Sequence, residues 1–297
     1  MQSYILSCES TIDLPYSYTI EHQLPILFYT YCVDGEEFTD DMGKKDGSLQ
    51  AFYQMLDAGK LPSTSQINVA TYMVFFEEQL QSGKDLLHIA FGSGMTASVN
   101  NAIVAAEELK EKYPNQRIEV IDSYCSSSGY GFLVDEAVTL RDQGATFDEV
   151  LKRVLAIRKR IHHQFFSTDL TFYRRSGRMS GAAATIGNIL DICPIMRLND
   201  EGKIVAYDKV RGKKKAVKET VKTMEAHAEG GVNYSGKCWI CHSNCIEEAE
   251  AMKKAVLEHF PNITGDVRIC DIGTIIASHC GPGTVAVYFL GDEREPS

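Results

Sequence analysis

The strongest constraint on the fold is a repeated order of apolar strand, polar turn and amphipathic helix in the first 142 residues. Apolar runs at residues 86–90 and 118–121 are each followed by a polar turn and then by a helical pattern, over 98–112 and 129–141. Short apolar strands that alternate with helices of this length are typical of a parallel sheet with crossover helices. This part of the chain is therefore predicted to form a parallel α/β unit.

The same pattern extends toward the N-terminus. Strands are predicted over 4–7 and 26–33, and helices over 48–58 and 70–80. In a parallel sheet of this kind, ligands bind at the carboxyl ends of the strands. The polar residues expected at those ends are Ser10, Ser93 and Asp122.

The pattern changes after residue 160. Thr146 and Glu149 match a capping box, which opens a helix that is predicted to run to about Arg160. The later predicted elements are helices over 182–190, 213–227 and 246–259, strands over 164–173, 194–198, 204–210 and 237–242, and two final strands around a loop that contains His279. We therefore predict an α/β protein with a parallel-sheet domain over residues 1–160. A second α/β domain with mixed or antiparallel strands is predicted over residues 161–297.

The composition argues against several classes of function. The 297 residues carry a formal net charge of -10, and an acidic surface is repelled by the phosphates of nucleic acid. The first residues do not resemble a secretory signal, and no run of about 18 apolar residues occurs. We therefore expect a cytoplasmic protein whose nine cysteines are reduced thiols.

Three short polar stretches contain groups that suit the binding of one anion. They cover residues 63–66, 91–96 and 278–283. Hydroxyl groups, imidazole and exposed backbone N–H groups can all donate hydrogen bonds to an anion. The candidate ligand-binding residues in these stretches are Thr64, Ser65, Ser93, Gly94 and His279. A lone histidine is more often structural, but the adjoining Gly-Pro-Gly turn favours a role for His279 in a site.

Other motifs have simpler alternatives. Cys238-x-x-Cys241-His242 has the spacing of a haem attachment site, and Cys245 adds a third thiol, but the same residues also alternate like a strand. A zinc site usually needs two close pairs of ligands, and the second pair is absent from the sequence. Ser10-Thr11-x-Asp13 suits either phosphate binding or the capping of a helix, and capping is favoured.

Ser93 and the basic residues of the second half also have alternatives. A Gly-x-Ser-x-Gly nucleophile elbow would need glycine at Phe91 and Met95, so a hydroxyl ligand is favoured over a nucleophile. The basic residues are typical of a solvated surface or of a docking surface. Arg178 and Arg211 are favoured as functional because each lies beside a glycine turn or a predicted strand end.

Taken in order along the chain, these stretches resemble the motifs of the DegV family of bacterial fatty-acid-binding proteins. The resemblance runs through nearly the whole chain and rests on Ser10-Thr11-x-Asp13-Leu14-Pro15, Thr64-Ser65-Gln66, residues 91–98, Asp122-Ser123, Gly177-Arg178-Met179-Ser180, Pro194-Ile195, Val210-Arg211 and His279-x-Gly281-Pro282-Gly283. Three positions depart from the family pattern: Ile67-Asn68 replaces Pro-Ser, Gly92 replaces a serine, and Ala97 replaces a glycine.

The resemblance implies a carrier that buries a fatty acid between its two domains. Its carboxylate would be presented to a separate ATP-dependent fatty acid kinase, whose acyl phosphate product enters phospholipid synthesis. Thr64 and Ser93, with the adjoining Ser65 and Gly94, would hold the carboxylate, and His279 would complete the network. Arg178 and Arg211 would dock the kinase or meet the phosphate. No cofactor, metal or catalytic residue is implied; the alternative is a hydrolase or acyl transferase that uses Ser93 and His279.

Overall fold

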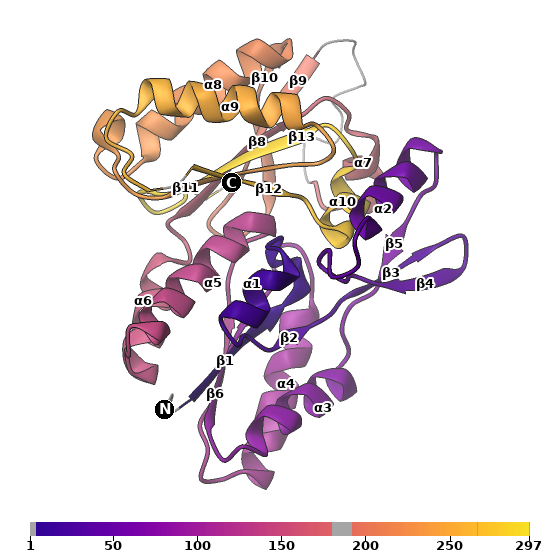
Figure 1. The fold of residues 1–297 in the computed structure, drawn as a ribbon, viewed down its shortest axis with the longest axis vertical. Coiled ribbons are helices and arrows are strands. Elements are labelled where there is room, and N and C mark those ends of the chain that lie inside the picture. Colours follow the sequence, from indigo (N-terminus) through magenta and orange to yellow (C-terminus); the bar gives the residue numbers. More distant parts are fainter. Residues whose placement is uncertain (1–3, 180–191, 266, 297) are drawn as a thin grey trace.

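Two main sheets form the body of the protein, one above the other in Figure 1. The computed structural model describes residues 4–179, 192–265 and 267–296. The lower sheet is built from the N-terminal half of the chain, and the upper sheet is built from residues after 160. Helix α5 (Ser127–Asp142) contacts strands of both sheets. This arrangement confirms the predicted α/β class.

The lower sheet has four parallel strands in the order β2-β1-β6-β7. Its strands are β1 (Tyr4–Glu9), β2 (Ile26–Leu27), β6 (Asp85–Ala90) and β7 (Ile118–Asp122). Helices α3 (Val69–Leu80) and α4 (Ser98–Lys112) lie on one side, and α5 and α6 (Phe147–Ile157) lie on the other (Figure 1). Because both faces are covered, Leu86, Leu87 and Ile89 are fully buried. The predicted parallel sheet with crossover helices is confirmed.

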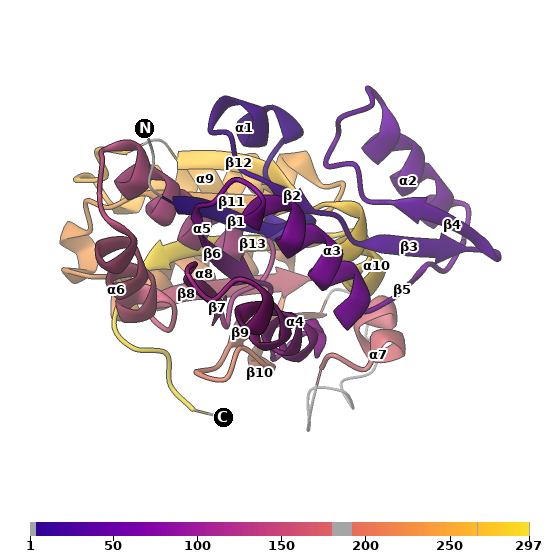
Figure 2. The ribbon, with the colours of Figure 1, turned by 90° about the horizontal axis from the view of Figure 1, so that it is seen from below.

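A small antiparallel sheet and α2 (Ser48–Asp57) project from one side of the molecule (Figures 1 and 2). Its strands are β3 (Thr30–Val33), β4 (Glu36–Thr39) and β5 (Ser63–Thr64), in the order β4-β3-β5. Asp34 and Gly35 both have positive φ, which suits the two-residue turn between β3 and β4. The single strand predicted over 26–33 is therefore divided between two sheets.

The upper sheet has six strands in the order β10-β9-β8-β13-β11-β12. They are β8 (Ile161–Ser167), β9 (Ile192–Leu198), β10 (Ile204–Arg211), β11 (Cys238–His242), β12 (Val267–Asp271) and β13 (Thr284–Leu290). The neighbours β11 and β12 are parallel, and the other four neighbouring pairs are antiparallel. The predicted mixed sheet and its hairpin, β9 and β10, are confirmed.

Helices α8 (Lys213–His227) and α9 (Ile246–His259) cover one face of this upper sheet (Figure 1). Alternate residues of one strand enter two different cores, because side chains in a strand point to opposite faces. In β13, Val285, Val287 and Phe289 pack in the core beneath α8 and α9. Ala286 and Tyr288 belong to the core that faces the lower sheet.

The remaining helices are short: α1 (Tyr16–Glu21), α7 (Thr171–Ser176), α10 (Thr274–Cys280) and the 3-10 turns Ser10–Ile12 and Gly231–Asn233. The strand predicted over 164–173 is wrong beyond Ser167, because the chain turns there and enters α7. The helix predicted over 182–190 lies outside the described residues. The proposed boundary at residue 160 falls between α6 and β8 and stays a prediction.

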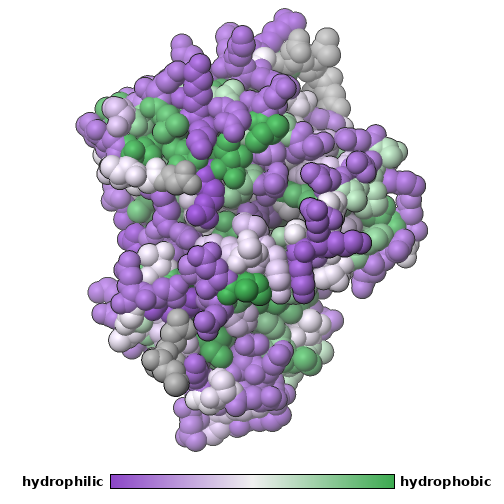
Figure 3. All heavy atoms as spheres, viewed as in Figure 1, coloured by the Kyte–Doolittle hydropathy of each residue, from purple (hydrophilic) through white to green (hydrophobic). Residues whose placement is uncertain are grey.

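The outer surface is mostly hydrophilic in the view of Figure 3, where hydrophobic residues occur in scattered groups. Among the described residues, no helix has both the length and the apolar character needed to cross a bilayer.

Candidate functional site

A cavity lies where the lower sheet, the small antiparallel sheet and the upper sheet meet. It contains about 880 Å³ of space between atoms, part of which is open to solvent. Most of its walls are apolar, including Tyr29, Phe91, Met95, Phe165 and Ile275. A cavity with mainly apolar walls and a few polar groups is typical of a site for a small molecule with a large hydrophobic part.

Thr64 and His279 form the polar feature of one wall. The Oγ1 atom of Thr64, on β5, lies 2.7 Å from the Nε2 atom of His279, on α10. Both residues line the cavity, and so does Ser65. Two of the predicted polar stretches are therefore brought together, although 215 residues separate them in the sequence.

His279 lies on a helix and not in a loop, which corrects the sequence analysis. Helix α10 begins after Gly273 and ends at Gly281, whose φ of 66° is in the left-handed region. A Cβ atom at Gly281 would lie only 2.3 Å from the ring of Phe172. Glycine is therefore required twice, by the backbone conformation and by the close approach of α7.

His279 is a neutral imidazole at neutral pH. Its pKa is lowered to about 4, first by burial and then by the positive charges of Arg178 and Arg175. Its Nδ1 atom is buried and has no hydrogen-bond partner among the residues that the structure describes. A neutral imidazole and a hydroxyl carry one donor proton each, and the bond between them uses only one. Thr64 and His279 together therefore keep one donor for another group.

The third predicted stretch reaches the cavity through different residues from those expected. Phe91, Met95 and Thr96 line the cavity, whereas Ser93 and Gly94 are not among its lining residues. Ser93 is exposed, and its backbone N–H donates to Asp122 Oδ1 at 3.0 Å. The predicted loop therefore lines the cavity, but Ser93 does not, and its role as a ligand-binding residue stays a prediction. Thr96, in the same motif, is the hydroxyl residue of this loop that lines the cavity.

Gly94 lies against the β9–β10 hairpin. A Cβ atom at this position would lie 2.2 Å from the carbonyl oxygen of Gly202. The role of Gly94 in this structure is thus a close contact between the two halves of the molecule.

The two predicted arginines lie apart. Arg178 lines the cavity, and its guanidinium donates to the carbonyl oxygen of Ser176 at 2.5 Å. Arg211 is exposed at the last residue of edge strand β10 and is not among the lining residues. Arg175, one turn before Arg178, donates to the carbonyl oxygens of Leu61 and Pro62, which precede β5. Helix α7 is thereby tied to the strand that carries Thr64.

Glu9 supports the opposite wall and was not identified from the sequence. It is fully buried at the end of β1. Its Oε2 accepts hydrogen bonds from the backbone N–H of Phe91 at 2.9 Å and from the hydroxyl of Tyr29 at 3.4 Å. Both donors belong to lining residues, so this carboxyl group positions two parts of the cavity wall. The only signal in the sequence was an acidic residue directly after the first strand-like run.

The Ser10 motif does not cap a helix, so that interpretation is wrong. Helix α1 begins after Pro15 without a side-chain cap. Ser10 Oγ instead accepts from the backbone N–H of Tyr29 at 3.1 Å, and the carboxylate of Asp13 accepts from the hydroxyl of Ser127. These bonds join the end of β1 to neighbouring segments. Burial raises the pKa of Asp13 well above its ordinary value.

The cysteine motif on β11 does not form one ligand set. Cys238 belongs to the core beneath α8 and α9, whereas Cys241 belongs to the core on the opposite face of the sheet. The Sγ atom of Cys241 lies 2.9 Å from the hydroxyl of Tyr288. Residues three apart in a strand point in opposite directions, so these two thiols cannot bind the same ion. The strand interpretation of this motif is confirmed.

Comparison with known proteins adds an independent finding. A model of the DegV protein family matches residues 6–292. A DegV domain-containing protein of Clostridium perfringens is 34% identical over 299 residues, and the match covers 100% of both chains.

Two solved structures share the fold. A DegV family protein of Thermus thermophilus, described as fatty-acid binding, has a TM-score of 0.86 and 26% identity, with 97% of this chain and 99% of that chain covered. A fatty-acid-binding DegV family protein of Streptococcus agalactiae has a TM-score of 0.82 and 28% identity, with 99% and 100% covered.

Proposed function

The chain belongs to the DegV family, and on that premise we propose that it binds a fatty acid in the cavity beside Thr64 and His279. The hydrocarbon chain occupies the apolar part, against residues such as Phe91, Met95 and Phe165. The carboxylate lies at the wall formed by Thr64 and His279.

The observation that carries this proposal is the hydrogen bond of 2.7 Å between Thr64 and His279 in the wall of an otherwise mainly apolar cavity. The donor that the pair keeps is suited to an anionic oxygen, because a buried carboxylate needs hydrogen bonds to offset the loss of water. Each methylene group that enters the apolar part contributes about 0.8 kcal/mol. Affinity therefore comes mainly from the chain, and orientation comes from the polar pair.

The protein acts in the cytoplasm as a carrier that presents the bound carboxylate to a separate ATP-dependent fatty acid kinase. Two units that meet at residue 160 hold the ligand between them. Arg178, in the cavity wall, is suited to an acyl phosphate or to an acidic surface of the kinase, and Arg211 extends the basic surface outside the cavity. The alternative of a hydrolase receives no support from the geometry, because Ser93 is exposed outside the cavity lining while His279 is bonded to Thr64.

Binding of oleic acid to protein that has been freed of lipid tests the central proposal. Thr64→Val and His279→Gln should weaken binding by about tenfold each, because each removes part of the head-group site while leaving the apolar walls. Ser93→Ala is the matched control, and it should bind like the wild type. Failure of the wild type to bind, or equal losses in all three variants, would reject the proposed site.

Transfer of labelled phosphate from ATP tests the carrier role separately. With a fatty acid kinase present, Arg178→Ala should slow formation of the acyl phosphate while oleic acid binding is retained. Formation of the acyl phosphate by this protein and ATP without a kinase would contradict the carrier role. It would not contradict the proposed binding site.

A further inference from the structure

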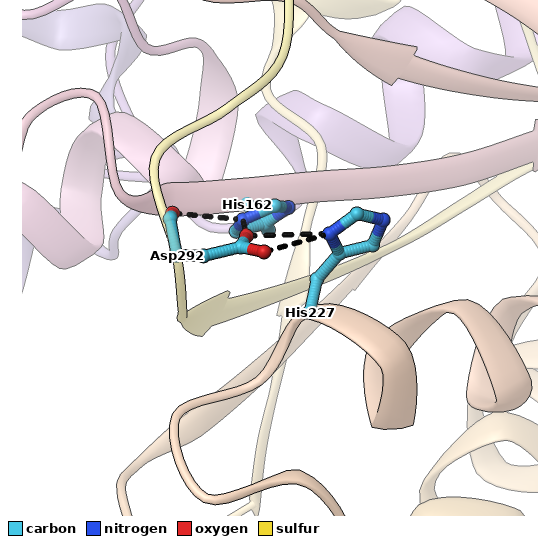
Figure 4. Close-up of side chains that lie close together, drawn as sticks. All are labelled: His162, His227 and Asp292. Carbon is cyan, nitrogen blue, oxygen red and sulfur yellow. Dashed lines mark hydrogen bonds and ion pairs between the residues drawn. The ribbon is translucent and has the colours of Figure 1, made fainter.

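Three metal-ligating side chains converge at the face of the upper sheet that points away from the cavity. They are His162 on β8, His227 at the last residue of α8, and Asp292 just after β13 (Figure 4). His162 Nε2 lies 2.9 Å from Asp292 Oδ1, and His227 Nδ1 lies 3.2 Å from the same oxygen. One ligand atom from each residue lies within 4.8 Å of the other two.

The distances from Asp292 Oδ1 to the two imidazole nitrogens are close to the distances between ligand atoms in a metal centre. In a tetrahedral zinc site with bonds of about 2.0–2.1 Å, neighbouring ligand atoms are about 3.3 Å apart. Figure 4 shows one ring nitrogen of His162, on β8, and one ring nitrogen of His227, on α8, directed at the carboxylate of Asp292. A small movement of the carboxylate would therefore place an ion between the three groups.

The surroundings hold one ligand in place and leave another accessible. His162 is buried, and its ring stacks on Phe289. Asp292 has 58% of its side chain exposed, so an ion can enter from solvent. Two arginines near these residues in the sequence have other partners. Arg160 is paired with Glu229 at 3.1 Å, and Arg294 donates to the backbone carbonyl oxygens of Ile161 and Tyr124.

We propose that His162, His227 and Asp292 bind one divalent transition-metal ion of the zinc class. Two imidazoles and one carboxylate suit zinc, and water completes the tetrahedron on the exposed side. The ion fastens the segment after β13 to β8 and α8. The site is separate from the proposed fatty acid site, because His162 and the cavity-lining His163 point to opposite faces of the same strand.

Calorimetric titration of chelator-treated protein with zinc chloride tests this inference. The wild type should bind one zinc ion per chain at this site and melt at a higher temperature when it is loaded. His227→Ala and Asp292→Ala should each weaken binding by at least about tenfold. His259→Ala is the matched control, since His259 lies 2.5 Å from Glu225 in a two-residue pair of the same chemistry, and it should bind like the wild type.

Anomalous diffraction at the zinc edge gives the location directly. A peak between the three side chains supports the site. No stoichiometric binding, a peak elsewhere, or equal affinities in wild type and Asp292→Ala would overturn it. Because oleic acid binding needs none of these three residues, it should be unchanged in both ligand variants.

Discussion

The two faces of the upper sheet share the same strands and yet have different interiors. On the face covered by α8 and α9, Ile240, Val285 and Val287 belong to a closely packed core. On the opposite face, Ala286 and Tyr288 line a cavity. The difference arises from what covers each face: α8 and α9 cover one, and α5 covers the other together with the loops and short helices around the cavity. Strand β13 thus places its odd-numbered residues in a packed core and its even-numbered residues 286 and 288 in the wall of a cavity.

The largest effect is expected from truncating a side chain of the packed face. Ile240→Ala should lower the free energy of unfolding by about 3 kcal/mol, because the surrounding helices cannot close the space that is left. Ile275→Ala, in the cavity wall, should cost about half as much, since its side chain already borders open space. Denaturant unfolding measures both. Equal losses would show that the two faces are packed alike.

The pH dependence of stability can compare the two sides of the upper sheet, because each side has a histidine whose pKa is about 4. These histidines are His279 and His162. Their folded pKa lies below the ordinary 6.5, so between about pH 6.5 and 4 the unfolded chain takes up protons that the folded protein does not. Stability from each is present above pH 6.5 and is lost as pH falls, by at most about 3 kcal/mol. His279→Gln and His162→Gln should each flatten this dependence in the presence of chelator.

Oleic acid should distinguish the pH dependence that comes from His279 from the pH dependence that comes from His162. A carboxylate beside His279 favours its charged form, so ligand should reduce the contribution of His279 and leave that of His162 unchanged. Asp40, whose pKa is raised by burial to about 6, acts in the opposite direction below pH 6 and is common to both variants, so it cancels in the comparison. Chemical unfolding at pH 7, 6 and 5 measures these slopes; a ligand effect on His162 would contradict the separation of the faces.

Filling the cavity should affect binding more than stability. Ala286→Leu places a larger side chain in open space, so oleic acid affinity should fall at least about tenfold, or about 1.4 kcal/mol, with little change in unfolding. Ala249→Leu, on α9 above the packed face, should do the reverse, because that core has no room for added atoms. Calorimetry and thermal melts together distinguish the outcomes. Loss of stability in both variants would indicate that the cavity wall is as closely packed as the other core.

The smallest effect concerns the two cysteines of β11. Cys238→Ser should cost about 1 kcal/mol, because it buries a hydroxyl among apolar side chains. Cys241→Ser should cost less, since its hydroxyl can keep the bond to Tyr288. Thermal melts compare them, and a larger loss at Cys241 would be the contrary result.

Long helices with clear periodicity could be predicted from the sequence, and the short helix that carries His279 could not. The helices predicted over 98–112, 213–227 and 246–259 match α4, α8 and α9, because 14 or 15 residues give several turns of amphipathic pattern. Helix α10 has only seven residues and a buried, mostly apolar sequence, so its periodicity gave no warning. Thr64 and His279 could be predicted as candidate polar ligands from their residue types. The hydrogen bond between them could not be predicted.

Ser93 shows why the site was only partly predictable. A motif identifies a loop, but the direction of each side chain depends on backbone angles that adjacent small residues allow to vary. His162, His227 and Asp292 are further out of reach, since steps of 65 residues separate them and tertiary packing alone brings them together.

The contact between Gly94 and Gly202 has a mechanical consequence. The main chains of the loop after β6 and of the β9–β10 turn meet there without any intervening side chain. A single methyl group at residue 94 would force these two main chains apart. The absence of a side chain at this one position therefore determines how closely the two halves of the molecule meet.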